Sequence, residues 1–272
     1  MSHFNLAQFA VFMVGLAVGL FGMAVTTRVF NLGRENFRKQ RIASMAGLAV
    51  VIGGAVFYAA HSLLPGLVTP TAGVYLLVTL VFGGLGILDD VRGDRSVGGF
   101  RGHIGALRQG KVTTGLAKML GGSAAALAAG FLLHHTSPWR AVLTALVIAL
   151  TANTLNLLDL RPGRCLFGFS LGALAVIAGH VAGGQLFFFA VAVAIVLYPL
   201  DARGFVMLGD TGSNAFGAIL GVALSTTFGW PVQLALVACM AGFQIWCERN
   251  SWSRTIEGNA VLRAIDVRIG VR

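Results

Sequence analysis

Charged residues are scarce in this sequence. Only 11% of its 272 residues are Asp, Glu, Lys or Arg, whereas 56% are hydrophobic. Soluble domains carry about 25% charged residues, and a globular core of this size cannot hide so much apolar surface. The composition therefore excludes a soluble globular protein and leaves an integral membrane protein.

Other features are lacking too. The three cysteines, Cys165, Cys239 and Cys247, form no metal-binding spacing, which excludes a zinc site and a disulfide framework. No nucleic-acid motif accompanies the net charge of +10, so we expect no nucleic-acid partner. No ionisable residue lies in the middle of an apolar run, which disfavours an ion-coupled transporter.

Long apolar runs dominate what is present. A helix needs about 20 apolar residues to cross a membrane, and alternating strands of a porin-type barrel are not seen in the sequence. The candidate spans are 6–27, 42–64, 71–88, 115–134, 139–158, 166–182, 185–200, 211–228 and 230–247. The sequence predicts an all-α, polytopic transmembrane helical bundle of about nine spans, forming one domain over residues 1–248.

Positive charges predict the orientation. If the chain crosses nine times, 19 of its 20 Lys and Arg residues fall on one side, and only Arg140 lies opposite. Cytoplasmic loops attract Lys and Arg, so we expect the N-terminus outside and the C-terminus in the cytoplasm, in the inner (cytoplasmic) membrane. No basic segment precedes the first apolar run, and we expect that run to be retained as a helix. Leu262, Ile265 and Ile269 lie at helical spacing among arginines, so residues 249–272 predict a basic amphipathic helix on the inner leaflet.

Acidic residues cluster on the same predicted side. All ten fall there, although acids contribute little to orientation, so their placement needs another cause. The stretch "GILDD" ends the third span, "TANTLNLLDLRPG" (151–163) ends the fifth, and "FVMLGDTGSNAFGAILG" (205–221) begins the eighth. Asn153, Asn156 and Asp159 recur every three residues, which aligns them along one side of a helix.

The residue types in these stretches favour magnesium and a diphosphate. Mg2+ takes hard oxygen ligands and completes its shell with water and substrate phosphates. Gly209 and Asp210 open a predicted helix whose free N–H groups favour an anion. Further cations on this side are the basic loop 101–118 with His103, and Arg34, Arg38, Lys39 and Arg41. The sequence therefore predicts a magnesium-diphosphate site on the cytoplasmic face, with a membrane lipid as the second substrate.

Simpler structural roles stay open for these residues. Asp210 within "GDTGS" is also typical of a helix cap. The amide side chains of Asn153 and Asn156 are able to hydrogen-bond neighbouring helices instead of a ligand. Asp89 and Asp90 gain little from capping because adjacent like charges repel, so this pair favours a functional role.

The motifs "LDD", "NTLNLLD" and "LGDTGS", in this order and each at a cytoplasmic helix end, resemble one known family. It comprises the polyprenyl-phosphate N-acetylhexosamine-1-phosphate transferases, among them phospho-MurNAc-pentapeptide translocase. The resemblance covers about Arg34 to Gly221. It implies Mg2+-dependent transfer of an N-acetylhexosamine-1-phosphate from a UDP-sugar to undecaprenyl (polyprenyl) phosphate, with release of UMP. Such a reaction serves cell-envelope glycan synthesis, including peptidoglycan, and a homodimer stays open.

The resemblance also implies roles for individual residues. Asp89, Asp90 and Asp210 match catalytic aspartates, and Asn156 together with Asp210 matches the residues associated with the metal. The positions that match substrate-binding residues are Lys118, Asn153, Asp159 and Gly209. Either the lipid phosphate attacks directly or an aspartate forms a covalent intermediate. We expect direct attack, because a phosphate needs little help as a nucleophile once Mg2+ neutralises the diphosphate.

Two departures from the family pattern keep an alternative open. Pro162 stands where the translocase has a further aspartate, and "ERNSWSRTIEGNAVLRAID" stands in place of its His-rich motif. These changes alter the expected donor. They are also compatible with a non-catalytic paralogue that binds nucleotide sugar or lipid phosphate as a partner in envelope assembly.

Overall fold

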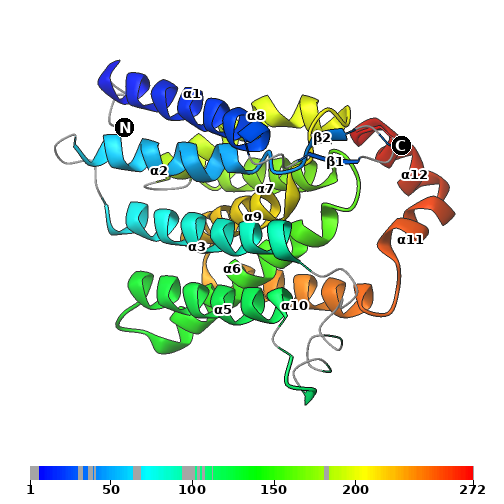
Figure 1. Ribbon diagram of the computed structural model, residues 1–272. Helices are drawn as coiled ribbons and strands as arrows, with labels where there is room; N and C mark the ends of the chain where they lie inside the picture. The colour runs from blue at the N-terminus through cyan, green and yellow to red at the C-terminus, as the bar shows by residue number, and fades with distance from the viewer. Residues whose placement is uncertain are drawn as a thin grey trace.

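The chain folds into a bundle of helices that lie side by side along one direction (Figure 1). The structure is a computed structural model. It describes residues 6–29, 33–35, 39, 41–63, 69–93, 102, 105, 108–111, 113–180 and 184–271.

In the part of the chain that the structure describes, nine helices form the bundle and two short ones form the C-terminal tail. The bundle helices are α1 (Leu6–Val29), α2 (Leu48–Ser62), α3 (Pro70–Arg92), α5 (Thr114–Leu133), α6 (Pro138–Leu158), α7 (Arg164–Ala178), α8 (Gln185–Ala202), α9 (Gly209–Thr227) and α10 (Trp230–Cys247). The tail holds α11 (Trp252–Gly258) and α12 (Ala260–Ile269). The predicted helical class is confirmed for the described residues.

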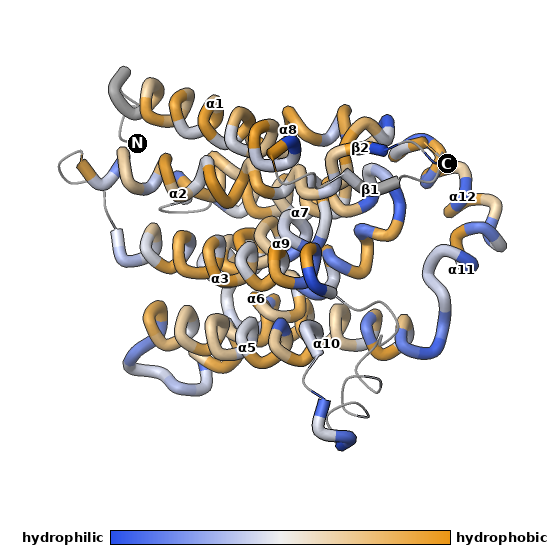
Figure 2. The backbone as a smooth tube through the Cα atoms, viewed as in Figure 1, coloured by the Kyte–Doolittle hydropathy of each residue, from blue (hydrophilic) through white to orange (hydrophobic). Residues whose placement is uncertain are grey.

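Each predicted span overlaps one of the nine bundle helices of the described residues, but the span 42–64 was predicted to begin too early. Residues 42 and 43 belong to a short strand, β2 (Arg41–Ala43), and α2 begins only at Leu48. Six of the bundle helices are long and apolar enough to cross a membrane: α1, α3, α5, α6, α8 and α10. Helices α2 and α7 are apolar but shorter, at 15 residues each. Figure 2 shows apolar residues along the helices, with polar segments gathered toward the ends, especially the end that carries α11 and α12. These features indicate a membrane-embedded protein.

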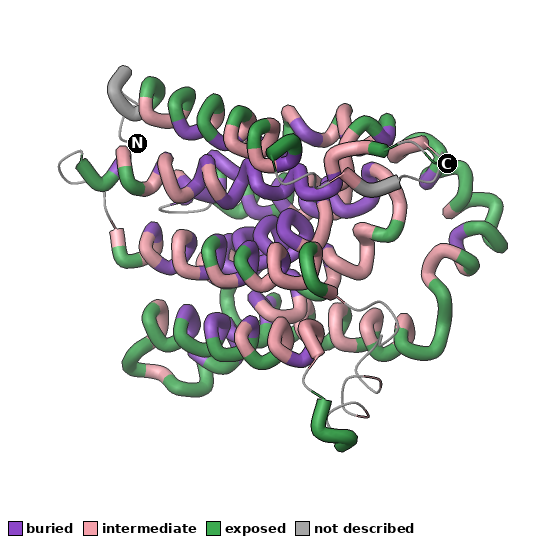
Figure 3. The backbone as a smooth tube through the Cα atoms, viewed as in Figure 1, coloured by how far each residue is buried: buried purple, intermediate pink, exposed green. Residues whose placement is uncertain are grey.

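Helix α9 forms the buried centre of the bundle (Figure 3). Small residues let α6 approach it closely: a Cβ on Gly217 would lie 2.5 Å from the Ala152 Cα, and one on Gly221 would lie 2.6 Å from the Ile148 Cα. Without a hydrophobic force between helices in lipid, such close van der Waals packing is a main source of association. The polar first turn of α9 is thereby fixed within the bundle.

A short hairpin is the exception to the predicted all-α class. Strands β1 (Gly33–Glu35) and β2 (Arg41–Ala43) pair antiparallel between α1 and α2. The carbonyl of Ala43 accepts a hydrogen bond from the Met207 N–H at 2.7 Å. Because Met207 lies just before α9, the hairpin is attached to the segment that leads into the central helix.

The C-terminal tail folds back onto the protein, which the sequence did not indicate. Two helices replace the single amphipathic helix predicted to lie on the leaflet. Asp266 on α12 is buried and receives hydrogen bonds from the Arg164 guanidinium at 2.6 and 2.9 Å. The Val271 N–H also donates to the Ala202 carbonyl at 2.8 Å. A buried carboxylate seeks a cation partner, and Arg164 at the start of α7 supplies it.

Replacing Asp266 tests this attachment. Asp266→Asn should lower the free energy of unfolding by about 3–5 kcal/mol, because it leaves the Arg164 guanidinium buried without a counter-charge. Reversible unfolding in mixed micelles measures the change. The matched control is Glu257→Gln in the same tail. It breaks the solvent-exposed 3.7 Å contact of Glu257 with Arg161, which lies between α6 and α7, and should change stability by no more than about 0.5 kcal/mol. Equal effects of the two substitutions would contradict the docked tail.

Candidate functional site

Three helices bring charged side chains together at one end of the bundle. Asp89 comes from the last turn of α3, Lys118 from the second turn of α5 and Asp210 from the first turn of α9. The Lys118 Nζ lies 3.2 Å from the Asp89 Oδ2 and also donates to the Asp210 Oδ2. Thr114, one turn before Lys118, donates its hydroxyl to the Asp89 Oδ1 at 2.6 Å. The predicted convergence of Asp89 with Asp210 is thus found, with one ammonium between two carboxylates.

Close packing of α3 against α9 makes this convergence possible. A Cβ on Gly86 would lie 2.5 Å from the Thr211 Cα, so the two backbones are nearly in contact one turn before Asp90. Any larger residue at position 86 would push α3 away from the first turn of α9. The spacing between Asp89 and Asp210 therefore depends on a glycine that carries no chemistry of its own.

Asp90 accepts hydrogen bonds from the backbone of α9. Its Oδ1 accepts the Asp210 N–H at 3.1 Å, and its Oδ2 accepts the Thr211 N–H at 2.9 Å and the Thr211 hydroxyl at 2.7 Å. A carboxylate near a helix N-terminus satisfies free amides and interacts favourably with the helix dipole. Asp90 therefore caps α9 from a different helix, and we assign it a positioning role rather than the direct chemistry that the sequence predicted.

Asp159 completes the cap. It follows the last residue of α6 and accepts a backbone hydrogen bond from Gly209. Burial raises the pKa of Asp159 well above its ordinary value, and the nearby carboxylates of Asp201, Asp210 and Asp90 raise it further. Asp159 thus contacts the helix backbone.

The first turn of α9 is not an open anion site. The N–H groups of Gly209, Asp210 and Thr211 donate to Asp159 or Asp90. The prediction that free amides here would bind a phosphate is therefore wrong for these three, because two carboxylates of the chain already occupy them. Gly209 itself has φ +74°, and a Cβ there would lie 2.6 Å from the Ser44 carbonyl oxygen, so the turn requires glycine.

The two asparagines of the predicted polar face have different surroundings. The Asn156 amide donates to the Ser213 Oγ at 3.0 Å, which places Asn156 beside α9 one turn beyond Asp210. The Asn153 amide instead donates to the Gln244 Oε1 at 2.7 Å, on α10. A period of three residues rotates the side chain around the helix by about 60° per step, so Asn153 and Asn156 reach different neighbours.

The Asp89 and Asp210 carboxylates offer oxygen atoms of the kind that magnesium prefers. Among the described residues no group of three or more His, Cys, Asp or Glu is positioned to hold a metal. Mg2+ needs fewer, since one or two carboxylates with water and substrate phosphates suffice. Asp89 and Asp210 already approach one common atom, the Lys118 Nζ, so they would hold the ion if that ammonium moved aside.

Some predicted cations cannot be compared with this geometry. Arg38, His103 and five further positions of the loop 101–118 (101, 104, 106, 107 and 112) lie outside the described residues, and so does the side chain of Arg34. Thr114 and Thr211 are contacts that sequence reasoning missed. The spacing of four residues between Thr114 and Lys118 is the only signal in the sequence that aligns them on one helix face.

The capping role of Asp90 leads to a stability prediction. Asp90→Ala should lower the free energy of unfolding by about 1–3 kcal/mol, because the donors of Asp210 and Thr211 lose their acceptor. Thr211→Val removes only the hydroxyl bond and should cost about 1 kcal/mol. Unfolding of the two variants in mixed micelles measures both values. Wild-type stability of Asp90→Ala would contradict the cap.

Lys118 and a divalent cation should compete for the same carboxylates. Lys118→Met removes the ammonium, and two carboxylates without a counter-charge should then bind Mn2+, used as a spectroscopic probe, about tenfold more tightly or better. Electron paramagnetic resonance of free Mn2+ measures the affinity in wild type and variant. The double variant Lys118→Met/Asp210→Asn serves as the control and should lose the gain. Weaker binding by Lys118→Met would argue against this pair as the metal site.

The comparisons with known proteins assign no family to the protein. The sequence matches no family model, and no curated protein sequence matches it.

Proposed function

We propose that the protein is a Mg2+-dependent transferase that moves an N-acetylhexosamine-1-phosphate from a UDP-sugar to a polyprenyl phosphate and releases UMP. The observation that carries the proposal is the meeting of Asp89, Lys118 and Asp210 from three helices at one end of a membrane-embedded bundle. Metal-binding oxygens, a cation for phosphate and direct access to lipid are the three requirements of such a reaction.

The proposed topology has nine crossings, with the N-terminus outside and the site facing the cytoplasm. Every bundle helix corresponds to an expected span, and the polar segments gather toward the end that carries the carboxylates and the tail. A UDP-sugar reaches this side from the cytosol, while the polyprenyl phosphate reaches it laterally through the lipid. Both substrates therefore meet where Asp89 and Asp210 lie.

The proposed reaction is a single displacement at phosphorus. An oxygen of the lipid phosphate forms a bond to the phosphorus that bears the sugar, the diphosphate bond breaks, and UMP leaves with the electron pair. Bound Mg2+ would neutralise the diphosphate oxygens as negative charge develops. Asp89 and Asp210 would hold the ion, and the displaced Lys118 ammonium would bind a phosphate oxygen. Asp90 and Asp159 fix the first turn of α9, and so keep Asp210 in place.

A second candidate is a non-catalytic paralogue that binds nucleotide sugar or lipid phosphate. One observation favours it: the polar groups of the site satisfy one another. Lys118 neutralises Asp89 and Asp210, and Asp90 and Asp159 occupy the amides of α9. A site of this kind is stable without a ligand. Retained binding of a UDP-sugar without UMP release would identify it.

Release of UMP tests the transferase directly. Purified protein with undecaprenyl phosphate, Mg2+ and a panel of UDP-N-acetylhexosamines should release UMP, and chelation of the metal should abolish it. Asp89→Asn and Asp210→Asn should each lower kcat by about 100-fold or more, because each removes charge that holds the metal against the diphosphate. Glu257→Gln in the tail should retain wild-type activity. Undiminished release by both aspartate variants, or no release with any donor, would contradict the proposal.

A further inference from the structure

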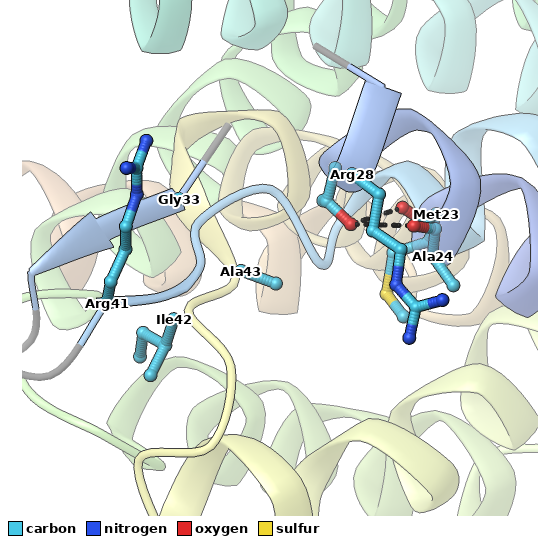
Figure 4. A pocket seen from close by; sticks show the side chains of 8 residues that line it. Met23, Ala24, Arg28, Gly33, Arg41, Ile42 and Ala43 are labelled. Carbon is cyan, nitrogen blue, oxygen red and sulfur yellow. Dashed lines mark hydrogen bonds between the residues drawn. The ribbon is translucent and has the colours of Figure 1, made fainter. Parts of the chain in front are cut away.

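A second cationic site lies where α1 meets the hairpin. A cavity of about 490 Å³ is lined there by Arg28 on the last turn of α1, by Arg41 on β2 and by small or apolar residues. Figure 4 shows Arg28 on the helix side and Arg41 on the strand side, with Ala43 between them. Both arginines are exposed. The cavity therefore combines two guanidinium groups with an apolar wall.

Gly33 helps to define the position of Arg41. A Cβ on Gly33 would lie 2.8 Å from the Arg41 Nε and 2.9 Å from its Cγ, so the side chain of Arg41 lies directly across this glycine. The register of the hairpin pairs Glu35 with Arg41 and thereby fixes the strand position of the arginine. The hairpin thus places Arg41 among the residues that line the cavity.

An exposed apolar stripe on α1 leads to this cavity. It consists of Val14, Val18, Phe21, Val25 and Val29, all more than a third exposed and spaced three or four residues apart. Arg28 lies on the border between this stripe and the face that lines the cavity, which carries Ala24 and Thr27. In a membrane-embedded chain the stripe faces acyl chains. A molecule with a hydrocarbon tail on the stripe would have its head group at Arg28 and Arg41.

We propose that this cavity binds the phosphate head group of an anionic phospholipid. Arginine matches phosphate with parallel N–H donors, and polar groups at a helix end are positioned at the depth of lipid head groups. Among the described residues that line the cavity, none has an aromatic side chain on which a nucleobase would stack. An occupant with one phosphate and an apolar body therefore fits better than a nucleotide.

This site is separate from the carboxylate cluster, although both lie at the same end of the bundle. Ala43 lines the cavity, and its carbonyl accepts the hydrogen bond from Met207, three residues before Asp210. A lipid held at Arg28 and Arg41 would therefore stabilise the hairpin that supports the entry to α9. The inference does not depend on the transferase chemistry.

Lipid titration followed by native mass spectrometry tests the site. The full chain in detergent should bind phosphatidylglycerol in preference to phosphatidylcholine. Each of Arg28→Gln and Arg41→Gln should weaken phosphatidylglycerol binding about fivefold, and the double variant about 30-fold, because each arginine contributes separately to attraction of an anionic lipid. The matched control is Arg249→Gln, an exposed arginine just after α10, which should change the affinity less than about twofold.

A second variant distinguishes a shaped site from general charge attraction. Ala24→Leu narrows the cavity but leaves both arginines in place, and it should also weaken phosphatidylglycerol binding. Unchanged binding by Ala24→Leu, or by the double arginine variant with an unchanged melting temperature, would overturn the proposal. Displacement of the lipid by an equal concentration of inorganic phosphate would identify a free-anion site and would overturn it as well.

Discussion

The position of α9 depends on two carboxylates that hold its first turn. Asp90 from α3 and Asp159 from the end of α6 accept the N–H groups of Gly209, Asp210 and Thr211. Buried amides at a helix N-terminus are costly without acceptors, and the positive end of the dipole further favours the charged carboxylate of Asp90. Three helices are thereby joined at one point, and Asp210 is directed toward Lys118.

The two adjacent aspartates Asp89 and Asp90 have different kinds of partner. Asp89 contacts Lys118 and Thr114 through side chains, whereas Asp90 contacts backbone donors of α9. Neighbouring residues on a helix point about 100° apart, so one can face an open site while the next faces a packed helix. Loss of either aspartate is expected to disable the proposed site, but for different physical reasons.

Much of this architecture is readable in the sequence because membrane insertion imposes simple rules. Each apolar run predicts a helix, since every backbone polar group in lipid needs a partner within its own segment. In the described part of the chain, each of the nine bundle helices overlaps a predicted run, although the run 42–64 also includes the end of strand β2. The meeting of Asp89 with Asp210 was also predicted, because both were expected at helix ends on one side of the membrane. The docking of the tail was not predicted, since spacing alone does not reveal that Asp266 is buried against Arg164.

The sequence by itself determined the helical, membrane-embedded class, the helix positions and the acidic stretches that gather at one end. Only the tertiary structure decided which atoms those acids contact. It gave Asp89 and Asp90 different hydrogen-bond partners and placed the Lys118 ammonium between two carboxylates. It also directed Asn153 toward α10 rather than α9. The reason is physical: apolar length and periodicity are local properties of a chain. The approach of Gly86 to Thr211 depends instead on how whole helices pack.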